Sequence, residues 1–578
     1  MRINFFLFVT ASFFTLSLFC QTYITNVTLI DVEKQKLIPD VTVVITGNTI
    51  SDIGPSKKIK LLTDATIIDG KGKFLLPGLT DAHIHFFQSG GLYTRPDVID
   101  LRKYISYEKE IDWTHNNMED ILRRYTQTGI TTVIDVGATI NFLQQRDSFK
   151  NKNYAPSIYM TGPLLTTWEP EVFKNLQNDE PFNLVKTPEE AKATVQKQLP
   201  FRPDFIKIWY IVPHGKNLED SAKKLLPVVK AIIDEAHKNN LKVAVHATER
   251  ITAQLAVESK CDYLVHEINN EIVSDEFLFL LKKNNIIVCP TLIVADNYAK
   301  TFARENQFSY YDLTKSNSEQ LGSLYDLKHL SDTNLVEQLK KRGKLKQIAL
   351  IKSDSIMRVN LKKMSDAGIA IVSGTDAGNI GTQHATSYFA ELLSMQQSGL
   401  SNWQIIQSST INGAKVLGKE KEFGSITTGK RADMILLNAN PLDNLNNLQK
   451  IFLIINKGFV INPDTLIKET PLSLVQRQLN AYNARNLDAF VEQYADDVEL
   501  YKFPDTLIGK GKEYMYKTYS SLFDKTPNLH CEIKKRIIQG NIIIDNESVT
   551  RNNKIKQSKC IAIYHIENNK IKKVYFIK

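Results

Sequence analysis

The central part of the chain alternates short apolar runs with longer amphipathic stretches. Eight runs between residues 73 and 418 have the length and the Ile and Val content of buried strands: FLLPGLTDAHIHF, GITTVIDVG, SIYMTGPLL, DFIKIWYIV, LKVAVHA, YLVHEI, IIVCPTLIV and IAIVSGTDA. Strands that alternate with helical segments are typical of βα units and a parallel sheet. Eight such units predict an α/β fold, a (β/α)8 TIM barrel whose functional residues lie at the carboxyl ends of its strands.

The two flanks of this barrel segment have a different pattern. Short β-rich runs broken by Gly, Asn and Asp fill residues 21–72, and a similar run, GSITTGKRADMILLNANP, lies within residues 419–465. Such runs are typical of small antiparallel sheets. We predict that both flanks close one small β-sandwich domain, with the barrel of residues 73–418 inserted between them.

A charged, tyrosine-bearing stretch at residues 296–346 separates the seventh apolar run from the eighth. It is much longer than an ordinary connecting loop, so we predict a helical insertion. Two interpretations stay open: a cap over the barrel mouth, or a surface excursion without a catalytic part.

Residues 471–578 change in character again. An amphipathic helical run, LVQRQLNAYNARNLDAFVEQYA, precedes strand-like segments rich in Ile, Val and Tyr. This order predicts a separate α+β domain. Because the candidate chemistry described below lies before Pro471, we expect the barrel to keep its site when this domain is removed.

The first residues follow the pattern of an export signal. Arg2 supplies the positive charge, and the apolar run of residues 5–19 is short for a membrane span. We predict a signal peptide over residues 1–20, and hence a periplasmic or secreted protein without stable membrane insertion after cleavage. Lipid attachment at Cys20 is the less favoured alternative, because bulky Phe19 stands where such processing usually needs a small residue.

Composition and charge narrow the classes of partner. The 578 residues are 43% hydrophobic, enough for two or three folding units. The formal net charge of +9 comes from scattered lysines, which favours a solvated surface over a nucleic-acid site. The five cysteines show no metal-ligand or redox spacing, and a disulfide between Cys531 and Cys560 stays open.

Four histidines fall at the carboxyl ends of predicted barrel strands. His83 and His85 are two residues apart in DAHIHF, so on a strand both side chains point to the same face. His246 closes the fifth run and His266 the sixth, while Asp376 follows the eighth run in SGTDAG. Imidazole and carboxylate ligands at one rim predict a metal site. For Asp376 alone, a helix cap is the alternative.

Lys207 stands between Ile206 and Ile208 on the fourth predicted strand, DFIKIWY. A charged amine inside an apolar barrel is costly unless it is paired or modified. Reaction of the neutral amine with carbon dioxide would give a carbamate, whose two oxygens can bridge two divalent metals. The alternative is an ammonium that reaches a carboxylate.

As a set, these residues resemble the amidohydrolase superfamily, over about residues 23–463. The PGL before the first histidine pair and the segment STINGAKVLG before GSITTGKRADMILL add to the likeness. The resemblance implies two divalent metal ions, expected to be Zn2+. It implies six ligands. The pair His83 and His85 would bind the more buried ion, together with Asp376. The pair His246 and His266 would bind the more exposed ion, and a carbamate on Lys207 would bind both.

The resemblance also implies a reaction. Two cations lower the pKa of a bridging water, and the resulting hydroxide attacks a carbonyl that the exposed ion polarises. Lys207 and Asp376 are the expected catalytic residues, with Asp376 passing the proton to the leaving nitrogen. The imidazolonepropionase-like and prolidase-like branch is the most similar one, which predicts hydrolysis of an amide-type C–N bond, for example in Xaa-Pro dipeptides.

The substrate is less constrained. Tyr210, His214 and His384 lie just beyond strand ends and could bind a small-molecule or dipeptide substrate, with ordinary loop residues as the alternative. The stretch WYIVPHGKN after Lys207 departs from the glycine-rich turn of that branch, so a cyclic-amide hydrolase or a lactonase stays open. A non-catalytic binding protein is the alternative from another functional class.

The C-terminal domain resembles the SnoaL-like, or ketosteroid-isomerase-like, fold through its opening helices, the segment YADDVELY and its strand-rich end. The resemblance implies a cone-shaped α+β domain. Its sequence shows no acid-base pair, and a fold of this kind does not itself imply activity. We expect it to hold a ligand or to mediate a homo-oligomer.

Overall fold

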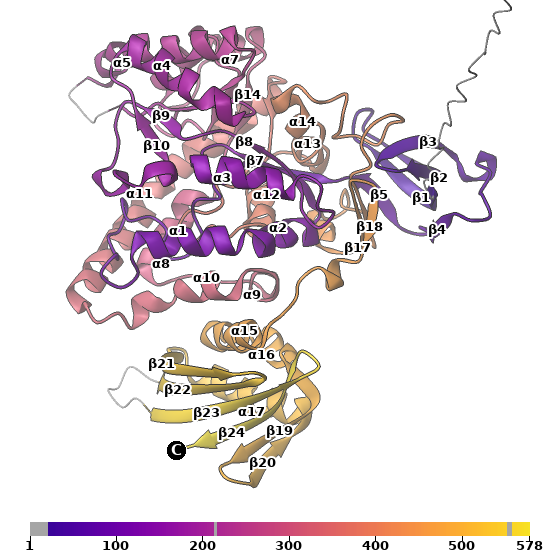
Figure 1. Ribbon diagram of the computed structural model, residues 1–578, viewed down its shortest axis with the longest axis vertical. Helices are drawn as coiled ribbons and strands as arrows, with labels where there is room; N and C mark the ends of the chain where they lie inside the picture. Colours follow the sequence, from indigo (N-terminus) through magenta and orange to yellow (C-terminus); the bar gives the residue numbers. More distant parts are fainter. Residues whose placement is uncertain (1–20, 213–216, 552–557) are drawn as a thin grey trace, which may run out of the picture.

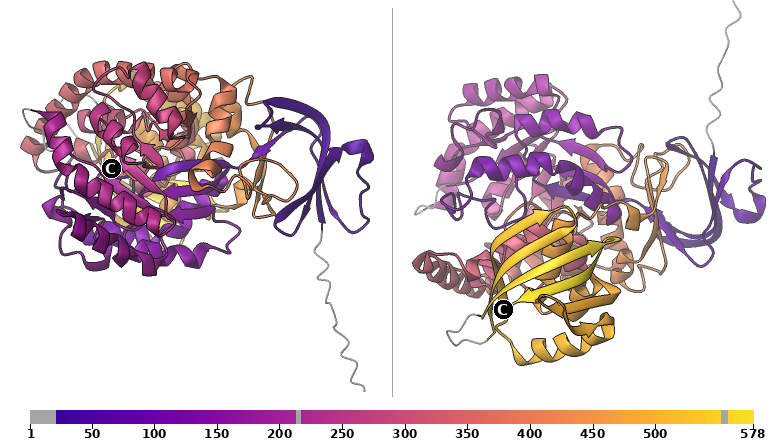
Figure 2. Two further views of the ribbon diagram at one scale, coloured as in Figure 1. Left: turned by 90° about the horizontal axis from the view of Figure 1, so that it is seen from above. Right: turned by 60° about the horizontal axis from the view of Figure 1, so that its bottom comes forward.

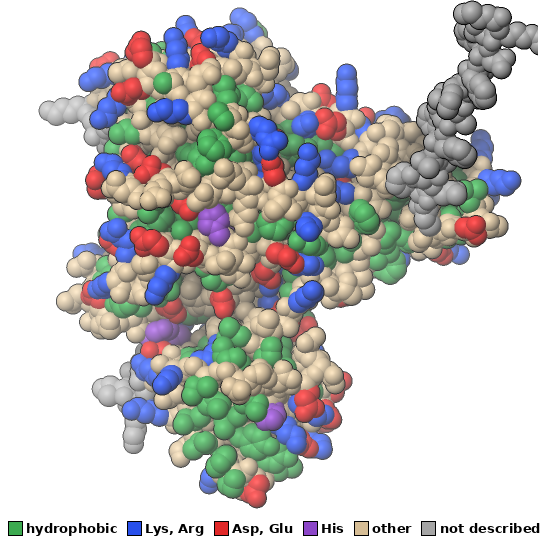
Figure 3. Space-filling model, in the orientation of Figure 1, with side chains coloured by type: hydrophobic (Ala, Val, Ile, Leu, Met, Phe, Trp, Pro, Cys, Tyr) green, Lys and Arg blue, Asp and Glu red, His purple; other side chains and the backbone are tan. Residues whose placement is uncertain are grey.

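The structure is a computed structural model that describes residues 21–212, 217–551 and 558–578 (Figure 1). The predicted signal peptide and His214 lie outside these residues. Within them, no helix is both long and apolar enough to cross a membrane. Basic and acidic side chains are interspersed over the face shown in Figure 3, which is typical of a solvated surface.

Parallel strands form the centre of the molecule in two hydrogen-bonded sheets. The first contains β6 (Leu79–Ile84), β7 (Ile130–Asp135) and β8 (Ser157–Met160). The second has the order β10 (Phe182–Leu184), β9 (Leu164–Thr166), β11 (Ile206–Trp209), β12 (Val243–His246), β13 (Tyr263–Val265), β14 (Ile287–Cys289) and β15 (Ala370–Ile371). Each of the eight predicted apolar runs therefore contains a strand.

These strands are covered on both faces. All residues of β6 and β7 are buried, as parallel strands with helices on their faces require. The residues after β15 return to β6, because the amide of Ala82 donates to the carbonyl oxygen of Ser373 at 3.0 Å. The ends of the first and eighth runs thus meet, while a closed (β/α)8 barrel stays a prediction.

Helices lie between and around these strands (Figure 1). Local signals set their ends: Thr187 caps α4 by accepting from the amide of Glu190, and Pro188 occupies its first turn. The helices up to the flanking sheet are α1 (Tyr107–Asn116), α2 (Met118–Gln127), α3 (Ile140–Gln145), α4 (Pro188–Gln198), α5 (Leu218–Lys238), α6 (Arg250–Glu258), α7 (Asp275–Lys283), α8 (Val294–Ala303), α9 (Tyr310–Lys315), α10 (Ser318–Ser323), α11 (Thr333–Asp366), α12 (Ser387–Gln397), α13 (Asn402–Ser408) and α14 (Ile411–Leu417).

The two flanks join in one hydrogen-bonded sheet beside the centre (Figure 1). β16 from the second flank pairs antiparallel with β5 from the first, so residues more than 350 positions apart lie next to each other. The division into two packed sheets stays a prediction. The strands run in the order β18 (Phe459–Ile461), β17 (Ile451–Asn456), β16 (Met434–Leu437), β5 (Phe74–Pro77), β1 (Gln21–Asp31), β2 (Lys36–Thr46) and β3 (Thr49–Pro55), with β4 (Thr66–Asp69) beside β1.

The C-terminal region folds into a curved sheet with helices (Figure 2). Its helices are α15 (Pro471–Ala484), α16 (Leu487–Glu492) and α17 (Gly511–Lys525). The strand order is β20 (Thr506–Lys510), β19 (Tyr494–Lys502), β24 (Lys570–Ile577), β23 (Ser558–Glu567), β22 (Ile542–Thr550) and β21 (His530–Gln539). Cys531 and Cys560 are free thiols, because they lie on β21 and β23 with β22 between them. The structure therefore contains no disulfide between this pair.

The C-terminal region shares its apolar core with the 296–346 insertion. Leu313, Leu321 and Tyr325 of the insertion are buried in the same cluster as Leu474 and Phe490. This result differs from the expectation of a separable domain, since removing the region would expose these side chains.

Candidate metal centre

The six predicted ligands line one cavity of about 390 Å3. The carboxyl ends of parallel strands meet at one edge, which explains why residues far apart in sequence come together. The ligands lie in or soon after five strands: His83 in β6 and His85 just after it, Lys207 in β11, His246 at the end of β12, His266 after β13 and Asp376 after β15.

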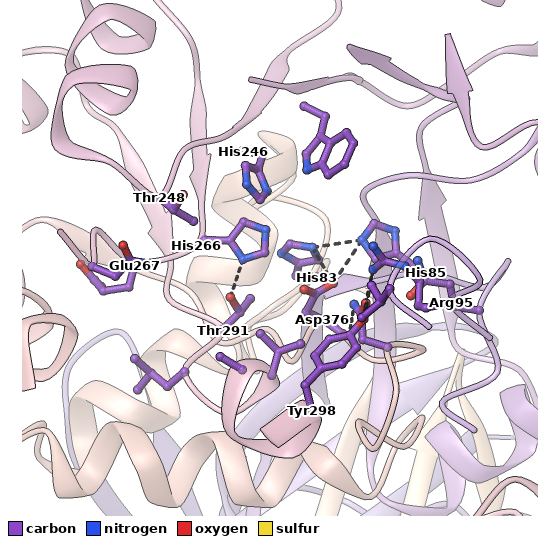
Figure 4. A pocket seen from close by; sticks show the side chains of 18 of the residues that line it. His83, His85, Arg95, His246, Thr248, His266, Glu267, Thr291, Tyr298 and Asp376 are labelled. Atoms are coloured by element: carbon purple, nitrogen blue, oxygen red, sulfur yellow. Dashed lines mark hydrogen bonds and ion pairs between the residues drawn. The ribbon is translucent and has the colours of Figure 1, made fainter. Parts of the chain in front are cut away.

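Three of these side chains converge on one point (Figure 4). Nε2 of His83 lies 3.3 Å from Nε2 of His85, and Oδ1 of Asp376 lies 3.2 Å from each nitrogen. That carboxylate oxygen is buried without a hydrogen-bond partner among the described residues. Lone pairs that face one another so closely repel unless a proton or cation lies between them. The set therefore fits a divalent metal ion.

A second group of donors lies beside the first. One ligand atom each from His83, His266 and Asp376 lie within 4.8 Å of one another, and the rings of His246 and His266 are 4.3 Å apart. Burial lowers the pKa of His83 to about 4 and holds the pKa values of His246 and His266 well below the ordinary value. These imidazoles are therefore neutral at pH 7, the form that binds metals.

Hydrogen bonds set the orientation of two of the rings. Nδ1 of His85 lies 3.0 Å from the carbonyl oxygen of Gly137, and Nδ1 of His266 lies 2.7 Å from the hydroxyl oxygen of Thr291. A ring whose Nδ1–H donates to such an acceptor presents the lone pair of Nε2 to the cavity.

Lys207 is buried between Ile206 and Ile208 and lines the same cavity. Burial lowers the pKa of its amine to about 7, against the attraction of Asp376. The amine forms no hydrogen bond or salt bridge with any described residue. The alternative of an ammonium paired with a carboxylate therefore finds no partner in the described part of the chain.

Two ligand candidates have a strained backbone. φ is +76° at His266 and +60° at Asp376, in the left-handed region that favours glycine. Such strain costs about 1–3 kcal/mol per residue and is often found at functional sites. Backbone hydrogen bonds hold both residues in this conformation. The amide of Asp376 donates to the carbonyl oxygen of His83 at 2.7 Å, and the amide of His266 donates to the carbonyl oxygen of Cys289 at 2.8 Å.

Two buried aspartates support the site, and the sequence analysis missed both. Asp81 accepts hydrogen bonds from the amide and the hydroxyl of Thr375, at 3.1 and 2.8 Å, directly before Asp376. Asp135 accepts from the amide of Phe86, at 3.0 Å, directly after His85. A signal was present, since each is an acidic residue within an apolar strand: Asp81 two residues before His83 in TDAHIHF, and Asp135 at the end of β7 in VIDVG.

The insertion supplies part of the cavity wall. Tyr298 donates to Oδ1 of Asn379 at 2.6 Å, and half-buried Arg95 donates to the same oxygen at 2.5 Å. Lys346 of α11 lines the cavity 5.1 Å from the ring centroid of Tyr298, and Arg342 lies one turn before it. Of the two interpretations of the insertion, the structure favours the one in which it takes part in the site.

The structure does not bring two of the predicted substrate residues, Tyr210 and His384, to this cavity. Tyr210 is buried, and its hydroxyl donates to the carbonyl oxygen of Ala222 at 2.6 Å. Nδ1 of His384 lies 2.9 Å from the hydroxyl of Tyr125, and Nε2 lies 2.8 Å from a backbone carbonyl oxygen. Neither side chain lines the cavity, because each is turned to an internal partner, and His214 lies outside the described residues.

The chain is similar to several known proteins. An enamidase from Eubacterium barkeri is 25% identical over 303 residues, which are 48% of this chain and 65% of the enamidase, just under two thirds of that relative. An imidazolonepropionase from Alkaliphilus metalliredigens is 22% identical over 470 residues, 75% of this chain and 94% of the relative. The crystal structure of a Xaa-Pro dipeptidase with bound methionine matches the structure of this chain with a TM-score of 0.58 at 23% sequence identity. The match covers 76% of this chain and 100% of the dipeptidase chain. At this identity, the match shows a shared fold alone.

Two family patterns match the chain directly. The SnoaL-like domain covers residues 475–574, and the amidohydrolase family covers residues 74–463, more than half of the chain. Since the amidohydrolase match includes every strand that carries a candidate ligand, the chain belongs to the amidohydrolase family and has a SnoaL-like domain at its C-terminal side.

Proposed function

We propose that this protein is an exported, metal-dependent hydrolase that cleaves an amide-type C–N bond in a small substrate with a free carboxylate, with Xaa-Pro dipeptides as the first candidates. The observation that carries the proposal is the convergence of four imidazoles, one carboxylate and one unpaired buried amine on a single cavity of about 390 Å3. Cavities of this size accept small-molecule ligands.

The ligands divide into two overlapping sets. His83, His85 and Asp376 would hold one ion, and His246 and His266 the other. Lys207 would bind both as a carbamate, which explains a buried amine without a partner. Zinc is the expected ion, because imidazole and carboxylate ligands suit it. When bound, two such cations lower the pKa of water and polarise a carbonyl oxygen.

The protein's own groups would move the proton. Oδ1 of Asp376 faces the point where His83 and His85 converge, so it can accept the proton of the attacking water and pass it to the leaving nitrogen. Thr375 and Asp81 hold the backbone directly before Asp376. This support keeps the carboxylate in place while it changes protonation state.

The cations of α11 favour a substrate with a free carboxylate. Lys346 lines the cavity without a hydrogen-bond or ion-pair partner among the described residues, and Arg342 lies beside it. Burial lowers the pKa of the Lys346 amine, and the neighbouring arginine lowers it further. An anionic substrate group would relieve this repulsion between cations.

Two alternatives use the same cavity. A cyclic-amide hydrolase or a lactonase would need the same ligands, and an imidazolonepropionase is among the relatives. A non-catalytic binding protein is less favoured, because such a protein has no need for six filled ligand positions and two strained ligand residues.

Metal analysis with a substrate panel tests the proposal. We expect two metal ions per chain in the purified protein and hydrolysis of Xaa-Pro dipeptides. A chelator should abolish the activity, and added Zn2+ should restore it. A folded protein that binds no metal would refute the metal centre. Metal-dependent opening of lactones or cyclic amides, with dipeptides left intact, would replace the dipeptide assignment.

A further inference from the structure

The C-terminal domain encloses a second cavity, of about 1080 Å3, between its sheet and its helices. Five tyrosines from four elements line it: Tyr482 of α15, Tyr494 of β19, Tyr514 and Tyr519 of α17, and Tyr564 of β23. Leu500, Ile508 and Val549 add apolar wall. A chamber of this size with aromatic walls can bury most of the surface of a small organic ligand.

One buried acid faces this chamber without a cationic partner. Glu547 of β22 accepts a hydrogen bond from the hydroxyl of Tyr564 at 2.8 Å and is 8% exposed. Asp545, two residues earlier on the same face of the strand, forms an ion pair with Arg536 at 2.6 Å. The inner face of β22 thus carries two acids: Asp545, whose charge Arg536 balances, and Glu547, which has no ion-pair partner among the described residues. A buried carboxylate without a cation is costly, which favours its uncharged form.

Other polar groups of the chamber are also available. The hydroxyls of Tyr482 and Tyr519 line it and form no hydrogen bond within the described residues. Basic side chains dominate the exposed part of the lining, and Glu547 is the one acidic residue of the described lining. The basic set is Lys502, Lys525, Arg551, Lys559 and Lys578.

We propose that this cavity binds an amphipathic carboxylic acid, with its apolar chain or aromatic body among the tyrosines and its carboxylate at the basic residues. The burial of apolar surface would supply most of the affinity, and the lysines would select the anion. The site is separate from the metal cavity, with which it shares no lining residue. It does not depend on the proposed hydrolase activity.

Calorimetric titration of the full-length, metal-loaded protein with decanoate and with 4-phenylbutyrate tests the site. Lys525→Glu combined with Lys559→Glu should weaken binding of both acids at least tenfold. The matched control is Lys517→Glu with Lys535→Glu, which makes the same change in charge on exposed residues outside the cavity lining. Binding of 1-decanol, which has no carboxylate, should change less than threefold in either double variant.

The pH dependence gives a second test. Burial raises the pKa of Glu547 to about 7, so its carboxyl is neutral below this pH and charged above it. A charged carboxylate repels the ligand, and the Kd for decanoate should therefore rise about tenfold from pH 6 to pH 8. Glu547→Gln should remove this rise. The other titratable and charged groups that face Glu547 are Tyr482, Tyr494, Tyr519, Cys531, Arg536, Asp545, Cys560 and Tyr564.

None of the neutral groups in this set titrates between pH 6 and 8. Burial raises the pKa of each of these tyrosines and of Cys531, and it raises the pKa of Cys560 to about 11.

Absence of measurable binding overturns the proposal. Equal weakening in the control double variant, or loss of binding when the metals are removed by chelation, also overturns it, because the acid would then bind elsewhere.

Discussion

Lys207 is the residue whose chemistry depends most on its surroundings. An amine that is buried in β11 and has no partner among the described residues is available for carbamylation. We expect Lys207→Ala to lower the metal content and to reduce turnover roughly a thousandfold or more. Added acetate or propionate should restore part of the activity, because a short carboxylate can occupy the vacated space and bridge the metals.

The fold should survive this substitution, since an unpaired buried amine contributes no stability. Thermal unfolding and elemental analysis of the same sample separate folding from metal loss. Lys192→Ala, on the exposed side of α4, serves as the control and should change neither quantity. A Lys207→Ala protein with two metals and near-normal rates would refute the carbamate assignment.

Lys346 makes a separate prediction about substrate choice. If its ammonium pairs with a substrate carboxylate, Lys346→Met should lower kcat/KM for a free dipeptide by about 10–100-fold, because a charged hydrogen bond contributes about 1.5–3 kcal/mol. For the same dipeptide with an amidated C-terminus, kcat/KM should change little, because this substrate has no carboxylate to pair with Lys346. Lys344→Met is the matched control, since Lys344 pairs with Glu305 outside the cavity. Equal losses for acid and amide would assign Lys346 to another role.

At the scale of elements, α9 and α10 join the two halves of the chain. Buried Arg477 of α15 donates to the carbonyl oxygens of Leu313 and Ser316, at 2.9 and 3.1 Å, and pairs with Glu469 at 2.7 Å. Arg124 of α2 donates to the carbonyl oxygen of Ser316 from the other side, at 3.0 Å. The segment between α9 and α10 is therefore held by guanidinium groups from both domains.

Arg477→Ala should destabilise the protein by about 3–5 kcal/mol, because it removes the cationic partner of half-buried Glu469 and the guanidinium donor of the Leu313 carbonyl oxygen. Urea unfolding measures the change. Arg102→Ala removes an exposed pair with Asp100 and should cost no more than about 1 kcal/mol. Similar costs for the two variants would mean that the junction contributes little.

At the scale of the whole molecule, the shared core changes the expectation for a truncated chain. Cutting after residue 470 uncovers Leu313, Leu321 and Tyr325, which are at most 5% exposed in the full chain. Each large apolar side chain contributes about 1.5–3 kcal/mol through burial. We therefore expect the truncated protein to unfold several degrees earlier and to aggregate, while its folded fraction still binds metal.

A truncated chain that also carries Leu313→Gln and Leu321→Gln should be more soluble than the truncated chain without them, because two of the uncovered apolar side chains are replaced by polar ones. Differential scanning calorimetry of the full, truncated and polar-substituted chains compares them directly. An unchanged unfolding temperature after truncation would support the separable domain that the sequence alone predicts.

The predicted export is also tested on the whole molecule. We expect intact-mass measurement of exported protein to give a chain that begins at Gln21, and Phe14→Asp with Leu16→Asp to block export, because charges interrupt the apolar run. A retained N-terminal stretch, or a lipid on Cys20, would contradict this processing.

The sequence by itself determined the features that depend on neighbouring residues. A strand buried on both faces needs a continuous apolar run, so the runs from FLLPGLTDAHIHF to IAIVSGTDA could be assigned without a structure. A residue at the carboxyl end of such a run lies at the common rim, and for this reason His246, His266 and Asp376 could be chosen as ligand candidates. Asp135 carried the same signal at the end of β7, whereas Asp81 lies inside β6, and its contact with Thr375 depends on the packing of distant segments.

Only the tertiary structure decided where long side chains and distant segments meet. Tyr210 and His384 stand near strand ends, yet internal partners turn both away from the cavity. Lys346 reaches the cavity from an insertion that no local pattern ties to it. Leu313 shares a core with residues more than 150 positions later. Local pattern fixes which face of an element is apolar, but contacts between distant residues depend on how all the elements pack, and that information is spread over the whole chain.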